Sequence, residues 1–173
     1  RNPGKKDGHW MSMKVLSAVD GESPQFSDLT GDGKPELVCI HAGAFGYAAP
    51  GEAGPFQPWE FHGLTRDLGH TRYTHGLGVG DVDGDGRKDI LERSGWWQQP
   101  EQDGEPWRKH EFAFSGPGGA DMFAYDVDGD GDNDVLTSLA AHGFGLAWYE
   151  HRRKEGGSIM FERHLILPEG RHE

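Results

Sequence analysis

The residues with the clearest chemistry are the acidic side chains of a nine-residue motif that occurs three times. Its copy at residues 81–89 has aspartates at the first, third, fifth and ninth places, and glycines at the fourth and sixth. Similar copies lie at residues 28–36 and 126–134. One such motif can arise by chance, but three in register indicate a common structural purpose. In chain order they are called loops 1, 2 and 3.

The spacing of the motif predicts a site for a hard cation, with calcium as the best candidate. Alternate residues of a tight loop point inward, so the first, third and fifth places present three oxygen-bearing side chains. The seventh place offers its backbone carbonyl and the ninth a further carboxylate. Calcium takes 6–8 oxygen ligands of these kinds at about 2.3–2.6 Å.

The sequence therefore predicts up to three Ca²⁺ ions as cofactors. The expected ligands are Asp28, Thr30, Asp32, Lys34 and Glu36 in loop 1, Asp81, Asp83, Asp85, Arg87 and Asp89 in loop 2, and Asp126, Asp128, Asp130, Asp132 and Asp134 in loop 3. Loop 1 is expected to bind least tightly, because a threonine hydroxyl is a weaker ligand than a carboxylate.

The charge of the chain is concentrated in these loops. They hold 12 of the 29 acidic residues, and the formal net charge of −12 would become −6 with three divalent ions bound (−12 + 3 × 2). Without metal, carboxylates so closely spaced repel one another. The alternative interpretation is a set of Asp/Gly-rich turns that bind no ion.

An EF-hand is the other calcium motif to consider, because loop 2 matches its pattern as far as Glu92 at the twelfth place. Loops 1 and 3 have Cys39 and Thr137 there, so the match is not shared. The stretch before loop 2, residues 75–80, is too glycine-rich for a helix. Short β-type runs follow all three loops, so they are expected to connect strands.

Further repeats surround the loops. Each loop is followed by an apolar run, an aromatic run that begins with glycine, and a run that ends in aromatic-x-x-His. The loops begin 53 and 45 residues apart (81 − 28 and 126 − 81). A period near 50 with about four strands per unit is typical of β-propeller blades.

The sequence thus predicts an all-β fold, with residues 1–173 forming one β-propeller portion. The expected blades cover about 23–63, 76–114 and 119–167, with 10–16 as the last strand of a preceding blade.

Residues 23–167, and the strings 81–89 and 126–134 above all, resemble the FG-GAP/VCBS repeats of bacterial extracytoplasmic propellers. Residues 45–50 even approximate the F-G-G-A-P string. The resemblance implies a propeller of about seven blades with calcium in each motif-bearing loop. Three blades and one strand cannot close such a ring, and an open arc leaves apolar blade faces uncovered. We therefore expect further blades or another subunit to complete it.

Composition limits the remaining possibilities. The sequence has no run of about 18 apolar residues, which a membrane-spanning helix would need. The acidic net charge argues against a nucleic-acid partner. Cys39 is the single cysteine and is expected to be a buried apolar residue. The chain starts at Arg1, which suggests a processed product or a portion of a longer chain. Calcium loops favour an extracytoplasmic location, periplasmic or secreted.

Other side chains that could do chemistry have simpler structural interpretations. One histidine recurs per repeat, at His62, His110 and His164, as expected of blade architecture. His75 and His142 lie beside glycine turns and are the better histidine candidates for ligand contact. The pairs Trp96–Trp97 and Trp148–Tyr149 are expected to pack between blades, with carbohydrate stacking as the alternative. Glu92 and Asp121 are acids outside the loops, without a nucleophile or base signature nearby.

The leading functional prediction is a binding or scaffold module that calcium stabilises, with a carbohydrate or protein ligand. No catalytic residues are predicted. The alternatives are a polysaccharide lyase or hydrolase, or a lectin, on the same scaffold, because propellers serve many functions.

Overall fold

A computed structural model describes Gly4, His9 and residues 12–170, and these form an all-β fold with no helix. Consequently, no helix in this part of the chain could cross a membrane. The strands are β1 (Asp20–Ser27), β2 (Glu36–His41), β3 (Ala44–Ala49), β4 (Glu60–Gly63), β5 (Leu77–Gly80), β6 (Asp89–Glu92), β7 (Gly95–Gln98), β8 (Arg108–Glu111), β9 (Met122–Tyr125), β10 (Asp134–Ser138), β11 (Leu146–Arg153) and β12 (Ile159–Leu167). The all-β prediction is confirmed.

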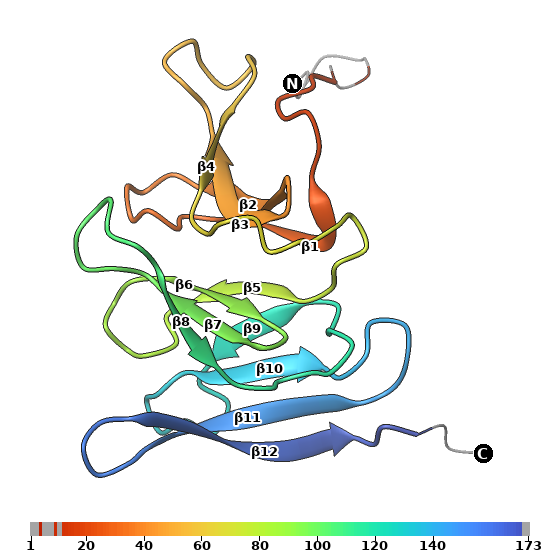
Figure 1. The fold of residues 1–173 in the computed structure, drawn as a ribbon, viewed down its shortest axis with the longest axis vertical. Coiled ribbons are helices and arrows are strands. Elements are labelled where there is room, and N and C mark those ends of the chain that lie inside the picture. The colour runs from red at the N-terminus through yellow and green to blue at the C-terminus, as the bar shows by residue number, and fades with distance from the viewer. Residues whose placement is uncertain (1–3, 5–8, 10–11, 171–173) are drawn as a thin grey trace.

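The strands form three four-stranded antiparallel meanders, stacked from top to bottom in Figure 1. Meander 1 is β1–β4, meander 2 is β5–β8 and meander 3 is β9–β12. The first strands of meanders 2 and 3 pair in parallel at Gly78 and Met122, which joins these meanders into one curled eight-stranded sheet. Successive meanders with adjacent first strands make the fold β-propeller-like.

The acidic loops join the first two strands of each meander, as expected, so they are not EF-hands. Their fourth and sixth places adopt positive φ angles, which glycine accepts without strain. In loop 2, for example, φ is 75° at Gly84 and 90° at Gly86. The glycine spacing thus lets a short loop fold back on its own carboxylates.

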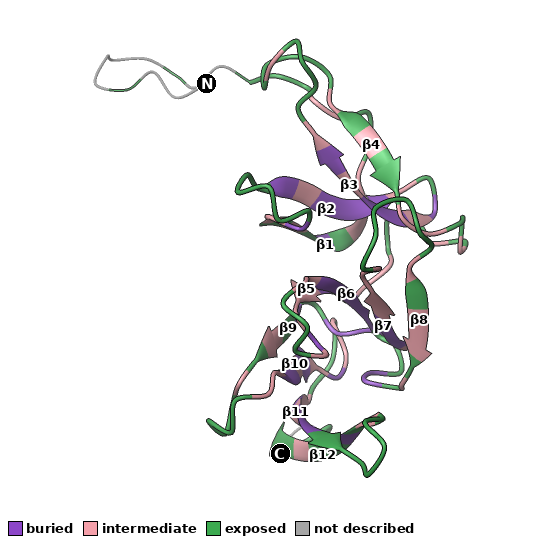
Figure 2. Cartoon of the chain, turned by 90° about the vertical axis from the view of Figure 1, so that its left-hand side faces the viewer, coloured by how far each residue is buried: buried purple, intermediate pink, exposed green. Residues whose placement is uncertain are grey.

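Two apolar clusters hold the meanders together. One cluster, between meanders 1 and 2, includes Leu29 and Ile90, and the other, between meanders 2 and 3, includes Val82, Trp96 and Phe161. Buried residues concentrate on the inner strands, whereas β4 and β12 are mainly exposed (Figure 2). Cys39 is fully buried on β2, as predicted.

The repeated histidines have an architectural role in each meander. Each lies on the fourth strand and stacks on the aromatic ring that faces it from the third strand. The ring pairs, with centroid distances, are Tyr47–His62 at 4.9 Å, Trp96–His110 at 4.1 Å and Trp148–His164 at 4.4 Å. Such stacking explains why the aromatic residue and the histidine recur together.

Meander 3 has an outer face that lacks the cover its counterparts have. The residue at the second place of the loop is 2% exposed in loop 1 (Leu29) and 0% exposed in loop 2 (Val82), but 39% exposed in loop 3 (Val127). Likewise, Leu91 on β6 is fully buried, whereas Leu136 at the same place of β10 is half-buried. Leu29 and Val82 pack against the following meander, and no described residue covers Val127 in that way.

The strand predicted at residues 10–16 is not found. Residues 10 and 11 lie outside the described residues, and residues 12–16 adopt no strand. The Val15 carbonyl accepts a hydrogen bond from the Trp59 N–H at 2.7 Å. This single hydrogen bond, to the residue just before β4, does not form a ladder. The blade boundaries proposed for residues 1–173 stay a prediction.

Candidate metal-binding loops

The three loops share a set of internal hydrogen bonds. In each, the carboxylate at the ninth place accepts a hydrogen bond from the N–H of the second place, which closes the loop across its base. The distances are 2.8 Å for Leu29 to Glu36, 2.8 Å for Val82 to Asp89 and 2.9 Å for Val127 to Asp134. The carboxylate at the first place also accepts from the glycine N–H at the sixth place in every loop.

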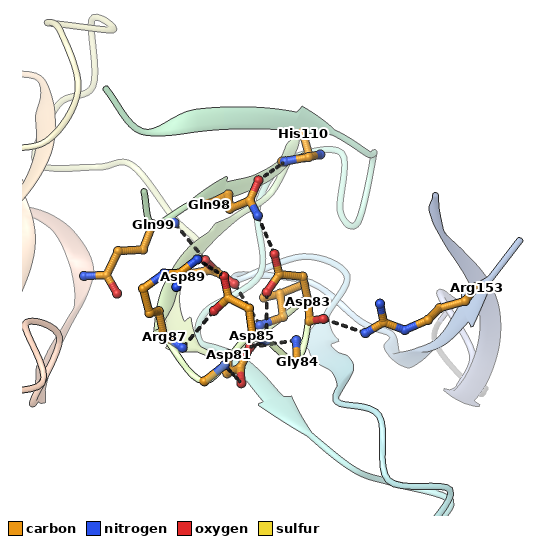
Figure 3. Close-up of polar contacts among 12 residues, drawn as sticks. Asp81, Asp83, Gly84, Asp85, Arg87, Asp89, Gln98, Gln99, His110 and Arg153 are labelled. Carbon is orange, nitrogen blue, oxygen red and sulfur yellow. Dashed lines mark hydrogen bonds and ion pairs between the residues drawn. The ribbon is translucent and has the colours of Figure 1, made fainter. Parts of the chain in front are cut away.

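Loop 2 shows how the carboxylates are held (Figure 3). Asp81 accepts hydrogen bonds from the N–H groups of Gly84 at 2.8 Å and Gly86 at 2.9 Å. Asp85 accepts from the Arg87 N–H at 2.8 Å and also pairs with its guanidinium. Asp83 accepts from the Asp85 N–H at 3.2 Å. These bonds fix the carboxylates while leaving further lone pairs free to bind a cation.

The ninth place is the most buried of the acidic places, at 4% exposure for Glu36, 0% for Asp89 and 1% for Asp134. Asp89 also accepts a hydrogen bond from the Gln99 N–H at 2.9 Å, which ties the loop to the end of β7. Burial raises the pKa of Asp89 to about 7, although its two backbone hydrogen bonds oppose that rise. A neighbouring cation would favour the charged carboxylate.

The pKa of Asp83, at the third place of loop 2, is raised as well. Burial and the nearby charge of Asp85 raise the pKa of Asp83. Its carboxylate accepts a hydrogen bond from the side chain of Gln98, which in turn contacts His110 at 3.0 Å (Figure 3). His110 on β8 thereby supports the loop through Gln98 at the end of β7.

Each loop brings acidic oxygens close enough for one ion. Within each group the potential ligand atoms all lie within 4.8 Å of one another. The groups are Asp28, Asp32 and Glu36 in loop 1, Asp81, Asp83 and Asp85 in loop 2, and Asp126, Asp128 and Asp134 in loop 3. Three acidic residues that were predicted as ligands, Asp89, Asp130 and Asp132, are not members of these groups. The Thr30 hydroxyl donates to Glu36 at 3.2 Å.

The residues present fit a hard cation. Every side chain of the three groups offers oxygen, the donor that calcium and magnesium prefer. In loop 1, one carboxylate oxygen of Asp28, Oδ1, is fully buried and has no hydrogen-bond partner among the described residues. A buried carboxylate oxygen without a partner is costly, and a bound cation would satisfy it.

Neighbouring loops are joined by the residue at the eighth place. In loop 3, the Asn133 side chain donates a hydrogen bond to the Asp81 carbonyl of loop 2 at 2.7 Å. In loop 2, the Lys88 ammonium donates to the Ser27 hydroxyl, next to loop 1, at 3.0 Å. Arg153 of β11 adds a hydrogen bond to the Asp83 carbonyl (Figure 3). Loop 3 therefore contacts loop 2, and loop 2 contacts the residue just before loop 1.

Two other candidates from the sequence are engaged elsewhere. Glu92 is buried, pairs with the Lys109 ammonium at 2.9 Å and accepts a hydrogen bond from the Trp97 indole at 3.2 Å. Trp96 is only 2% exposed, so its ring cannot stack on a carbohydrate in this structure. Both residues contribute to the packing of meander 2.

Gln98 and Gln99 are loop-supporting residues that the sequence interpretation missed. They lie about ten places after the end of loop 2, beyond any spacing in the motif. Only the antiparallel pairing of β6 with β7 returns them to the loop.

These features define a β-propeller-like repeat protein with acidic loops at equivalent places. The family model described as FG-GAP-like repeat matches residues 28–92, which span loops 1 and 2. This match agrees with the resemblance to FG-GAP repeats that the sequence predicted. No curated protein and no solved structure matches the chain. The repeat and the propeller-like fold support a role as a binding or scaffold module.

Proposed function

We propose that this protein is a calcium-binding, extracytoplasmic propeller module that binds or positions a carbohydrate or protein ligand, and that its calcium ions are structural. The observation that carries the proposal is the threefold repetition of one oxygen-lined loop with the same hydrogen bonds. A loop that served only as a turn would not need the unpartnered, buried oxygen of Asp28.

The side chains at the first, third, fifth and ninth places would hold the ion, with the carbonyl of the seventh place. A bound divalent ion supplies positive charge that offsets repulsion among the carboxylates. Because loop 3 donates a hydrogen bond to loop 2, order in one of these loops favours order in the other. The extracytoplasmic location follows from this role, since extracellular calcium modules work at dissociation constants of about 10⁻⁴–10⁻³ M.

The same proposal includes a partner on the outer face of meander 3. Val127, Leu136 and Trp148 are partly exposed there, whereas their equivalents in meander 2 are buried against meander 3. A further blade, or another subunit that presents one, would bury this face as meander 3 buries the face of meander 2. The occupant we favour is therefore a four-stranded meander of the same kind.

Thermal unfolding tests the calcium proposal. The protein is unfolded with excess chelator, with millimolar calcium, and with millimolar magnesium as the ion control. With about 10 mM calcium and a dissociation constant of about 10⁻⁴ M, a site is at 100 times its dissociation constant and adds about 2.7 kcal/mol. This corresponds to roughly 5–11 °C in Tm for a domain of this size. A calcium-selective rise is expected, and the same Tm in all three conditions would overturn the proposal.

A pair of matched variants locates the effect. Asp81→Asn keeps the shape of the first-place side chain and one hydrogen-bond acceptor, but removes its charge. It should lose part of the calcium-dependent rise. Glu52→Gln removes an exposed acid outside the loops and should keep the whole rise. Equal calcium responses of both variants would count against the loops as the binding sites.

A polysaccharide screen for binding and cleavage tests the module role. Binding without turnover supports it. Cleavage products would overturn it in favour of a lyase or hydrolase.

A further inference from the structure

A second cluster of potential ligands lies away from the acidic loops, where all three meanders meet. It consists of Glu22 on β1, His75 just before β5, and His142 in the turn between β10 and β11. One carboxylate oxygen of Glu22, Oε2, lies 3.3 Å from Nδ1 of His75 and 3.9 Å from Nε2 of His142. The two imidazole rings are 4.7 Å apart and nearly perpendicular.

Backbone contacts fix the positions of these side chains. The Glu22 N–H donates to the Thr74 carbonyl at 3.2 Å, next to His75. The Ala141 N–H, next to His142, donates to the Gly118 carbonyl at 2.9 Å. The entry to β5 and the turn between β10 and β11 lie at the same side of the molecule, on the right in Figure 1. The cluster is therefore part of the junction between meanders.

Gly118 shows how closely His75 is enclosed. Its φ angle is +97°, and a Cβ atom added there would lie 2.9 Å from the Cβ of His75. A residue with a side chain would displace the histidine. The backbone and Cβ of His75 are thus held against Gly118, and its imidazole lies beside Glu22.

An independent observation concerns the ligand atom of His75. Its Nδ1 is fully buried and makes no hydrogen bond to any described residue, although Glu22 is only 3.3 Å away. Leaving such a buried nitrogen without a hydrogen bond is costly. This arrangement suits a metal ion bound between Glu22 and His75 better than a direct hydrogen bond between them.

We propose that Glu22, His75 and His142 bind a borderline divalent cation of the zinc class. Imidazole suits zinc, copper, iron and nickel, whereas calcium prefers oxygen alone. Tetrahedral coordination with ligand bonds near 2.0–2.1 Å places ligand atoms about 3.4 Å apart. The separations of 3.3 and 3.9 Å need only a small side-chain adjustment.

The site is open on one side. The side chain of His142 is 77% exposed, whereas that of His75 is 15% exposed. Three protein ligands leave one position of a tetrahedral ion for water or for an anionic group of a ligand. The inference does not depend on calcium in the acidic loops, because the two sites share no residue and prefer different donor atoms.

Zinc binding to the whole chain tests this inference. The metal-free protein is titrated with Zn²⁺ at neutral pH against a chromophoric chelator, with millimolar calcium present to occupy the hard-oxygen loops. One tight equivalent of zinc is expected. Cobalt(II) provides a second readout, because tetrahedral coordination by two imidazoles and a carboxylate gives a strong visible absorption band.

The decisive variant is His142→Ala, because this exposed side chain can be removed without opening the core. Loss of an outer partner of a ligand already weakens metal binding about 10–100-fold, so loss of a ligand should weaken it at least about tenfold. Glu22→Gln should act in the same direction, and the exposed His9→Ala should leave zinc affinity unchanged. No zinc binding, or equal affinity in His142→Ala and the wild type, would overturn the proposal.

Discussion

The contact between the first strands of meanders 2 and 3 can be tested by adding one methyl group. Gly80 on β5 faces Ala124 on β9, and a Cβ atom added at Gly80 would lie 2.5 Å from the Cβ of Ala124. Methyl carbons pack best at about 3.5–4.0 Å. Gly80→Ala therefore forces the strands at least about 1 Å apart, two residues from the Gly78–Met122 pair that joins them into one sheet.

The cost follows from overpacking a close contact. Such substitutions destabilise by about 1–3 kcal/mol, which lowers Tm by roughly 2–12 °C for a domain of this size. Alanine in place of glycine also restricts the unfolded chain and stabilises by about 0.4–1 kcal/mol. Gly51→Ala measures that part alone, because a Cβ atom at Gly51 meets nothing within 4 Å.

A double variant separates this clash from a general loss of stability. Ala124→Gly removes the methyl group that the new one meets, because the next nearest atom to the added Cβ lies at 3.5 Å. Calorimetry on the wild type, both single variants and the double variant gives a coupling energy. The double variant should be more stable than the sum of the single effects by about 1 kcal/mol or more. Strictly additive effects would refute this account of how meanders 2 and 3 approach.

Three further predictions concern other parts of the fold. Val82→Ala should lower the free energy of unfolding by about 2 kcal/mol through lost burial, and Val127→Ala should lower it by much less. Chemical unfolding at low protein concentration measures both. Equal losses would mean that the outer face of meander 3 is covered in solution. Cys39 is fully buried and burial raises its pKa to about 11, so a thiol reagent at pH 8 should modify it only upon unfolding, and fast modification of the native protein would contradict its burial. Burial lowers the pKa of His70 below 6.5, so the unfolded chain takes up the proton first and stability should fall as the pH drops below about 6.5. Between pH 7.5 and 5.5, the Tm of His70→Gln should fall less steeply than that of the wild type. An unchanged slope would exclude His70 as a source of the pH dependence of stability.

The sequence predicted those features that depend on local spacing. The glycines and alternating acids of loop 2 indicated a tight loop between strands, because both the turn and the inward side chains are determined within nine residues. The recurrence of His110 after an aromatic strand indicated blade architecture, and stacking on Trp96 supplies the reason. Whether the loop oxygens bind calcium stays a prediction.

Features that depend on packing between meanders could not be predicted in the same way. Of the strand expected at 10–16, the described residues 12–16 adopt no strand, because a sequence pattern does not supply the neighbouring strands that a ladder needs. The Glu22, His75 and His142 cluster joins residues 53 and 67 positions apart (75 − 22 and 142 − 75). Its members meet only because the first strands of three meanders come together. Sequence reasoning marked the two histidines but not their carboxylate partner.

The hydrogen bonds from the eighth loop place give the chain of meanders a direction. Asn133 donates backward to loop 2, and Lys88 donates backward to the start of loop 1. Meanders 2 and 3 thus each present a donor toward the meander before them, whereas Pro35 at the eighth place of loop 1 offers none. Two such meanders cannot meet face to face through these groups. Contacts of this head-to-tail kind either continue indefinitely or close into a ring when the rotation per unit allows. A meander added after meander 3 would satisfy the same rule by placing a donor at the eighth place of its own loop, within reach of Asp126.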